Sequence, residues 1–152
     1  MILPQKNVLV VDVDRATRSA LVHLFDRMGL PAHPAADADE ALRAVDESVV
    51  APRLAVINYR LPREDGLALC RRLRAIRPDS QMIVLTSVSP RFEPRLERAQ
   101  EDREVDRVIE LPWKIQDFRT LARRFGQILE GEALPTFARN TRAPHQASFP
   151  PI

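Results

Sequence analysis

Carboxylate, amide and hydroxyl side chains follow three short apolar runs of this sequence. Asp12 and Asp14 come after NVLVV, Asn58 ends LAVIN, and Thr86 comes after MIVL. Side chains at such places either contact a ligand or accept backbone N–H bonds at turns and helix starts. Both roles stay open for Asp12, whereas we expect Asp14 to cap a helix and Thr86 to stabilise a turn.

The histidines and the single cysteine indicate no further site. His23, His33 and His145 are too widely scattered to suggest a metal site or a catalytic pair. Cys70 has no second cysteine to pair with, and it shares a helical stripe with the apolar residues Leu69, Leu73 and Ile76. We expect a small buried hydrophobe there, and therefore no metal, no cofactor and no redox chemistry.

Hydrophobic periodicity predicts five strands that alternate with five helices. The expected strands are short runs rich in β-branched residues, at 7–12, 30–35, 54–58, 82–85 and 105–111. The expected helices have apolar residues at helical spacing, over about 17–28, 38–45, 66–76, 93 onward and 115–129. Parallel strands need right-handed helical crossovers, so this order predicts an α/β fold with a doubly wound five-stranded parallel sheet.

The carboxyl ends of the strands are the expected place for functional groups in such a sheet. Those ends carry Asp12-Val13-Asp14, Asn58, Thr86 and Leu111-Pro112. All of these residues should therefore meet at one edge of the sheet.

Length and composition favour one cytoplasmic domain with an appended tail. With 152 residues and 45% hydrophobic content, the chain can fill a single core. It contains no apolar run of about 18 residues and no secretory leader at its N-terminus, so we expect no membrane segment. The balance of 23 basic and 21 acidic residues gives little support for a nucleic-acid partner.

The periodic pattern stops near residue 131. The remaining 22 residues, GEALPTFARNTRAPHQASFPPI, contain four prolines and no helical or strand period. We expect residues 1–130 to form the domain and 131–152 to form a disordered tail that folding does not require. Phe137 and Phe149, together with Arg139 and Arg142, make this tail a candidate recognition segment.

The order of motifs resembles the receiver domain of two-component response regulators. The resemblance covers about residues 7–129 and rests on VLVVD, Arg18, the loop with Pro62 and Asp65-Gly66, Leu85-Thr86-Ser87 and Leu111-Pro112-Trp113. It implies a flavodoxin-like receiver topology. It also implies a cis peptide bond between Leu111 and Pro112.

The chemistry that the resemblance implies is only partly supported by the residues present. The family uses an aspartate after the third strand to accept a phosphoryl group, an acidic pair that helps to bind Mg²⁺, a Thr or Ser, and a Lys before the proline. Here these positions hold Asn58, Val13 beside Asp12, Thr86 and Leu111. An amide is a poor nucleophile, valine offers no oxygen ligand, and leucine offers no positive charge.

We therefore predict a pseudo-receiver that signals by protein–protein interaction, without enzymatic activity of its own, in a two-component phosphorelay pathway. The expected partner is a histidine kinase or a regulator, and a homodimer through the fourth helix, fifth strand and fifth helix is a further expectation. Val108 takes the place of the family's switch aromatic, so that two-state ring is missing.

Three other functions are weighed against this prediction. A relocated acceptor, at Asp12, Asp14 or Asp65, would make the domain competent for phosphorylation. A flavodoxin-like binder of a small ligand would need a glycine-rich or hydroxyl-rich loop after the first strand, which DVDRATR does not provide. A transcription regulator would need a helix-turn-helix, and the 22 residues after the core leave no room for one.

Overall fold

The structure is a computed structural model that describes residues 6–133, with side chains described through residue 125. The chain divides after Trp113 into two compact units. The first unit contains β1 (Lys6–Val11), α1 (Arg15–Arg27), β2 (Ala32–Ala35), α2 (Ala38–Asp46), β3 (Val50–Asn58), α3 (Gly66–Ile76), β4 (Gln81–Thr86), the 3-10 turn η1 (Pro90–Phe92), α4 (Pro94–Glu101) and β5 (Arg107–Glu110). The second unit contains α5 (Ile115–Ala133).

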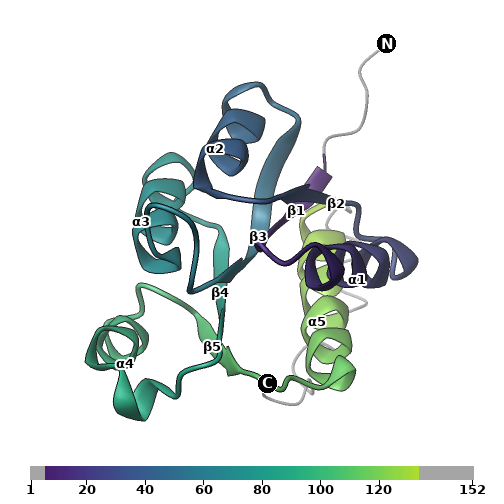
Figure 1. Ribbon diagram of the computed structural model, residues 1–152. Helices are drawn as coiled ribbons and strands as arrows, with labels where there is room; N and C mark the ends of the chain where they lie inside the picture. Colours follow the sequence, from purple (N-terminus) through teal and green to yellow (C-terminus); the bar gives the residue numbers. More distant parts are fainter. Residues whose placement is uncertain (1–5, 134–152) are drawn as a thin grey trace. The chain divides into compact units, whose positions relative to one another are not determined.

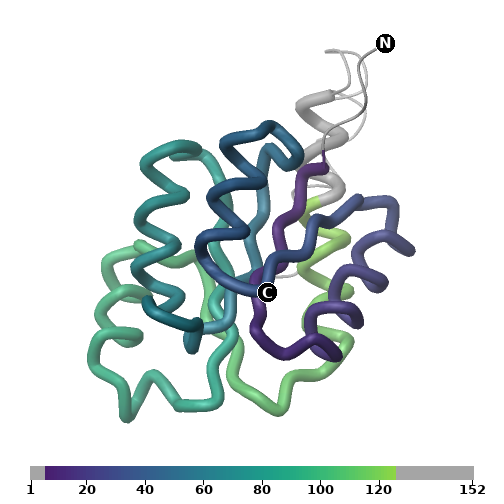
Figure 2. Tube along the Cα trace, turned by 45° about the horizontal axis from the view of Figure 1, so that its top comes forward, coloured from purple at the N-terminus to yellow at the C-terminus, as the bar shows by residue number. Residues whose placement is uncertain are grey.

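The first unit is built on one sheet. Its strand order is β2-β1-β3-β4-β5, and every neighbouring pair is parallel. Helix α1 lies on one face of this sheet, and α2, α3 and α4 lie on the other (Figures 1 and 2). The predicted doubly wound five-stranded parallel sheet is confirmed.

The central strands are buried on both faces, which explains their continuous apolar sequences. Leu9 and Val84 belong to a core cluster that includes residues of α2, α3 and α4. Val8 and Ile83, which precede them in the same strands, are also no more than 1% exposed. Because successive side chains of a strand point to opposite faces, both faces of the sheet are covered.

Three strands begin two or more residues away from the sequence expectation. β3 begins at Val50, four residues before the apolar run, because Val50 already pairs with Lys6 of β1. β2 begins at Ala32 instead of residue 30, and β5 is limited to Arg107–Glu110. Both are edge strands that pair on one side only, and short edge strands are the usual outcome at such positions.

Two expectations about the helices were wrong. Ile76, predicted to face inward, is 53% exposed as the last residue of α3. Helix α5 continues to Ala133 instead of ending near residue 129. Gly131 does not stop it, since a glycine inside a helix costs only about 1 kcal/mol relative to alanine. The rest of the expected tail, residues 134–152, lies outside the described residues.

Acidic side chains cap the helices of the first unit. Asp14, Asp37, Asp65 and Glu93 each accept a backbone N–H bond as the N-caps of α1, α2, α3 and α4. The expected capping role of Asp14 is confirmed. Gly29 closes α1 at φ +80°, in the left-handed region that favours glycine.

Helix α5 has one buried stripe. Among its described side chains, Phe118, Leu121, Ala122 and Phe125 are buried, as their helical spacing predicts. Leu129, which was expected on the same stripe, lies outside the described side chains. Within residues 6–133, no helix combines the length and apolar character that crossing a bilayer requires.

Cys70 should be chemically silent in the folded protein. It is 1% exposed, and burial raises the pKa of its thiol to about 12. Because the thiolate is the reactive form, we expect Ellman's reagent to label the native protein far more slowly than the protein in denaturant. Equal labelling rates in buffer and in denaturant would contradict the buried position.

Candidate functional site

The structure brings the predicted site residues together at the carboxyl edge of the sheet. Asp12 follows β1, Asn58 ends β3, Thr86 ends β4 and Leu111 follows β5. The strand registers align these ends, since Val11 pairs with Ile57, Asn58 with Leu85, and Thr86 with Glu110. Parallel strands therefore deliver residues that are far apart in the sequence to one small area, which we call the carboxyl-edge site.

Asp12 is the buried centre of the carboxyl-edge site. Its side chain is nearly inaccessible, with 1% of the residue exposed. Oδ1 accepts the backbone N–H of Asp14 at 2.8 Å, and Oδ2 accepts the side-chain amide of Asn58 at 3.1 Å. Arg18 supports the same loop by donating from Nη1 to the Asp12 carbonyl oxygen at 2.7 Å. Both carboxylate oxygens are thus satisfied within the protein.

Asn58 uses both ends of its amide. Nδ2 donates to Asp12, and Oδ1 accepts the backbone N–H of Arg60 at 2.8 Å. A carboxylate in this position would place a second negative charge where the amide nitrogen now donates a hydrogen bond. The amide therefore removes a repulsion that two ionised carboxylates would experience at this distance.

Thr86 is engaged in the turn that follows β4. Its hydroxyl accepts the backbone N–H of Val88 at 2.9 Å and donates to the Val88 carbonyl at 2.8 Å. The residue is 1% exposed. These contacts match the turn-stabilising role expected from the sequence.

Two exposed apolar side chains flank these polar residues. Val13 is 55% exposed beside Asp12, and Leu111 is 38% exposed after β5. The Leu111 backbone N–H donates to the Thr86 carbonyl oxygen at 2.8 Å. The Leu111–Pro112 peptide bond is cis, as the resemblance implied.

Asp14 is engaged as the cap of α1 and does not supply the carboxylate that is absent at Val13. Asp14 is bound by Thr17 through both the backbone N–H at 2.9 Å and the hydroxyl at 2.6 Å. The Thr17 hydroxyl and backbone bonds lower the pKa of the Asp14 carboxyl. Lys114 is exposed, and Val108 is a half-buried residue of β5 that packs against the core cluster.

The geometry of the loop between β3 and α3 requires both residues of the Asp65-Gly66 pair. Asp65 caps α3 by accepting the Ala68 N–H at 2.9 Å. A Cβ on Gly66 would lie 2.5 Å from the Asn58 carbonyl oxygen, so only glycine fits here. The Gly66 N–H donates to the Tyr59 carbonyl at 2.7 Å and fixes this close approach.

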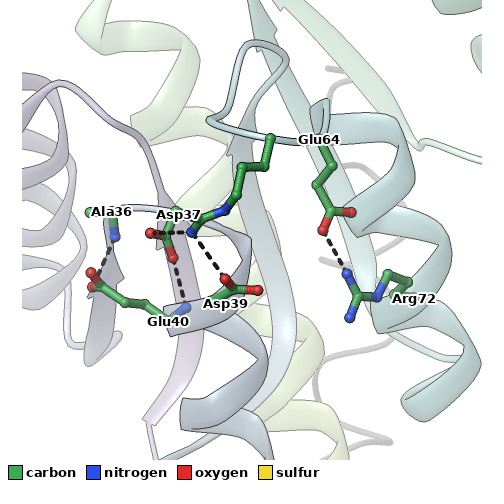
Figure 3. A network of polar contacts seen from close by, with 7 residues as sticks. Ala36, Asp37, Asp39, Glu40, Glu64 and Arg72 are labelled. Carbon is green, nitrogen blue, oxygen red and sulfur yellow. Dashed lines mark hydrogen bonds and ion pairs between the residues drawn. The ribbon is translucent and has the colours of Figure 1, made fainter.

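Salt bridges hold the same loop against α2 and α3. Arg63, at φ +70°, pairs with Asp37 at 3.3 Å and with Asp39 at 2.9 Å. Figure 3 shows the neighbouring pair of Glu64 with Arg72, which are 2.6 Å apart. Sequence reasoning missed these contacts because Arg63 and its partners are 24 and 26 residues apart.

Sequence reasoning also missed a contact between α4 and the site loops. Arg95 of α4 donates to the Tyr59 hydroxyl at 2.7 Å and forms an ion pair with Asp65 at 2.8 Å. No local pattern indicates this cluster, because Tyr59 and Arg95 are 36 residues apart.

The residues present do not fit the Mg²⁺ site that the resemblance implies. Magnesium prefers several oxygen ligands, commonly one or two carboxylates. Asp12 is the one carboxylate at the centre of the carboxyl-edge site, and its oxygens already accept hydrogen bonds from Asp14 and Asn58. Within the described part of the chain, no three His, Cys, Asp or Glu residues are grouped to hold a metal ion.

Comparison with known proteins identifies the family. The family model described as the response regulator receiver domain matches residues 8–123. Response regulator MprA of Mycobacterium sp. (strain KMS) is 38% identical over 80 residues, which cover 53% of this chain and 34% of that protein. The chain spans 34–42% of the length of the first curated relatives that it matches.

Solved receiver domains have the same fold. A CheY-like receiver domain protein from Methanospirillum hungatei JF-1 superposes with a TM-score of 0.70 at 22% identity, covering 86% of this chain and 98% of that one. The receiver domain of an HD domain-containing protein from Pseudomonas fluorescens Pf-5 gives 0.69 at 25% identity, covering 88% and 97%. With β1 to β5 in receiver order and the family model spanning them, this chain belongs to the receiver domain family of two-component response regulators.

Proposed function

We propose that this receiver domain is a pseudo-receiver, which signals without phosphorylation through contacts with a protein partner. The observation that carries the proposal is the hydrogen bond between Asn58 and Asp12. In the family, the end of the third strand holds the aspartate that accepts the phosphoryl group, and here that place holds an amide that bonds to the remaining carboxylate. The site is thus stable without the ion and the nucleophile that phosphorylation needs.

The chemistry of the amide supports the proposal. An amide oxygen is neutral and weakly nucleophilic, so it does not form the acyl phosphate that an ionised carboxylate forms. In Asn58 that oxygen also accepts a hydrogen bond from the Arg60 backbone, which holds it in place.

The charge balance of the carboxyl-edge site supports it as well. Relative to the family pattern, the site has lost two carboxylates, at Val13 and Asn58, and one ammonium, at Leu111. The three losses remove the nucleophile, a metal ligand and the cation that balances the transferred group. Their combined effect is a nearly neutral site with no excess negative charge for a divalent ion to offset.

The proposed partner is a histidine kinase or a regulator of a two-component phosphorelay in the cytoplasm, and the domain has no enzymatic activity of its own. We place the contact on the face that includes α4 and β5. In the first unit β5 is an edge strand, and Phe92, directly before the cap of α4, is 76% exposed. A partner that docks on α4 and β5 would bury this aromatic side chain and remove its apolar surface from water. A second copy of the chain is the other occupant proposed for this face.

Phosphodonor treatment tests the proposal. We expect no phosphate on the protein after incubation with acetyl phosphate and millimolar Mg²⁺, and no rise of the melting temperature with Mg²⁺. Intact-mass spectrometry measures the first result and thermal unfolding the second, with a phosphorylatable receiver domain treated in parallel as the control.

The same experiment distinguishes the relocated-acceptor alternative. Phosphate mapped to Asp12, Asp14 or Asp65 would show a receiver with a displaced acceptor and would overturn the proposal. We expect none, because Asp12 is buried and each of the three carboxylates already accepts hydrogen bonds within the protein.

A further inference from the structure

Helix α4 has few apolar contacts to hold it in place. It is eight residues long, and its buried side chains are those of Leu96 and Ala99. Helix α3, by contrast, buries five residues. Elements with little buried apolar area open most readily, so the position of α4 depends strongly on its polar contacts.

Arg95 makes the main polar contacts between α4 and the rest of the first unit. Its Nη2 donates to the Tyr59 hydroxyl at 2.7 Å and lies 2.8 Å from Asp65 Oδ2. The guanidinium carbon lies 5.9 Å from the centre of the Tyr59 ring. Glu93, the cap of α4, is a more distant neighbour, at 4.0 Å from Arg95 Nε. One guanidinium thus contacts two residues of the loop between β3 and α3.

Those two residues connect α4 directly to the carboxyl-edge site. Tyr59 follows Asn58, and its ring is largely buried. Burial is the main cause that raises the pKa of Tyr59, so its hydroxyl stays neutral and available as an acceptor. Asp65 uses Oδ1 to cap α3 and Oδ2 to bind Arg95. A carboxylate that is already fixed as a cap loses little further conformational entropy when it forms an ion pair.

We propose that Tyr59, Asp65 and Arg95 form a latch that holds α4 in one position and thereby fixes the proposed partner face. The inference rests on the proposed function. A pseudo-receiver needs α4 to be held in position without a phosphoryl group, and the latch would hold it there. Arg95 acts as a positioning residue, through charge and hydrogen bonding rather than through apolar packing.

Hydrogen exchange of the full chain tests the latch. In Arg95→Ala we expect the amides of residues 96–101 to exchange about fivefold faster, the effect of losing a modest ion pair in a local opening. Arg98→Ala is the matched control, because Arg98 is an exposed arginine of the same helix and has no ion pair with the described residues. The β3 amides serve as the reference for global stability.

A double-mutant cycle separates charge from capping. Asp65→Asn retains an oxygen that can cap α3 but removes the charge that binds Arg95. We expect Asp65→Asn to accelerate α4 exchange on its own and to add little in the Arg95→Ala background.

The outcomes are distinguishable from one another and from the phosphodonor test. Equal exchange rates of the α4 amides in Arg95→Ala and Arg98→Ala would contradict the latch. So would an acceleration of the β3 amides in Arg95→Ala as large as that of the α4 amides. Additive effects of Asp65→Asn and Arg95→Ala would also overturn it. Phosphorylation of the protein without substitutions would overturn the proposed function, but it would not change the comparison of exchange rates among the variants.

Discussion

Replacing Gly66 with alanine is expected to lower the free energy of unfolding by about 2–4 kcal/mol, the range of severe steric substitutions. The added Cβ would lie 2.5 Å from the Asn58 carbonyl oxygen and 3.0 Å from the Tyr59 Cα. Both are backbone atoms of the segment that ends β3, so neither can rotate away as a flexible side chain would. Equilibrium unfolding in urea measures the loss.

Gly29→Ala is the control for the Gly66 prediction. At Gly29 an added Cβ meets nothing within 4 Å, but the backbone is at φ +80°. The cost there is about 1–2 kcal/mol of backbone strain without steric overlap. If Gly66→Ala proved no more destabilising than Gly29→Ala, close approach to β3 would not be the reason for glycine at this position.

Restoring the three missing groups together is expected to create Mg²⁺-dependent stability. The variant Val13→Asp, Asn58→Asp, Leu111→Lys gains two carboxylates and an ammonium at the ends of β1, β3 and β5. A bound ion stabilises the folded state by about 2.7 kcal/mol when its concentration is 100 times Kd. Thermal unfolding with and without Mg²⁺ measures this gain, and acetyl phosphate labelling should follow it.

Asn58→Asp alone should lower the free energy of unfolding instead of raising it. Its carboxylate would lie beside that of Asp12 with no balancing cation, which raises the pKa of one member of the pair in the folded state. The destabilisation is full at pH values above this raised folded-state pKa. It decreases as the pH falls through that value and is gone once the pH reaches about 3.9, the unfolded-state value of aspartate. Urea unfolding at neutral and acidic pH measures this difference, and a loss independent of pH would contradict the charge explanation.

A matched triple variant tests whether position matters. Val49 is, like Val13, an exposed valine, but it lies before β3 at the other end of that strand. The variant Val49→Asp, Asn58→Asp, Leu111→Lys has the same charges and should gain no Mg²⁺ dependence. Equal stabilisation of both triple variants by Mg²⁺ would show that the ion binds elsewhere.

The sequence was sufficient for the fold because the relevant information is local. Apolar runs such as NVLVV and MIVL indicate strands buried on both faces, and helical spacing between them indicates the crossovers. Element ends were less predictable. Ile76 and the last turn of α5 differ from expectation, because the free energy that fixes a terminal residue is small.

The sequence by itself also determined which groups the site contains. The amide at position 58 is a poor nucleophile, the valine at 13 has no oxygen ligand and the leucine at 111 has no charge in any fold. The tertiary structure alone decided how the remaining groups are paired. It joins Asn58 to Asp12 across 46 residues, Arg95 to Tyr59 across 36, and Gly66 to the backbone of Asn58. Such pairings depend on the register of neighbouring parallel strands and on the course of the loops between them, and a one-dimensional pattern of hydrophobicity contains neither.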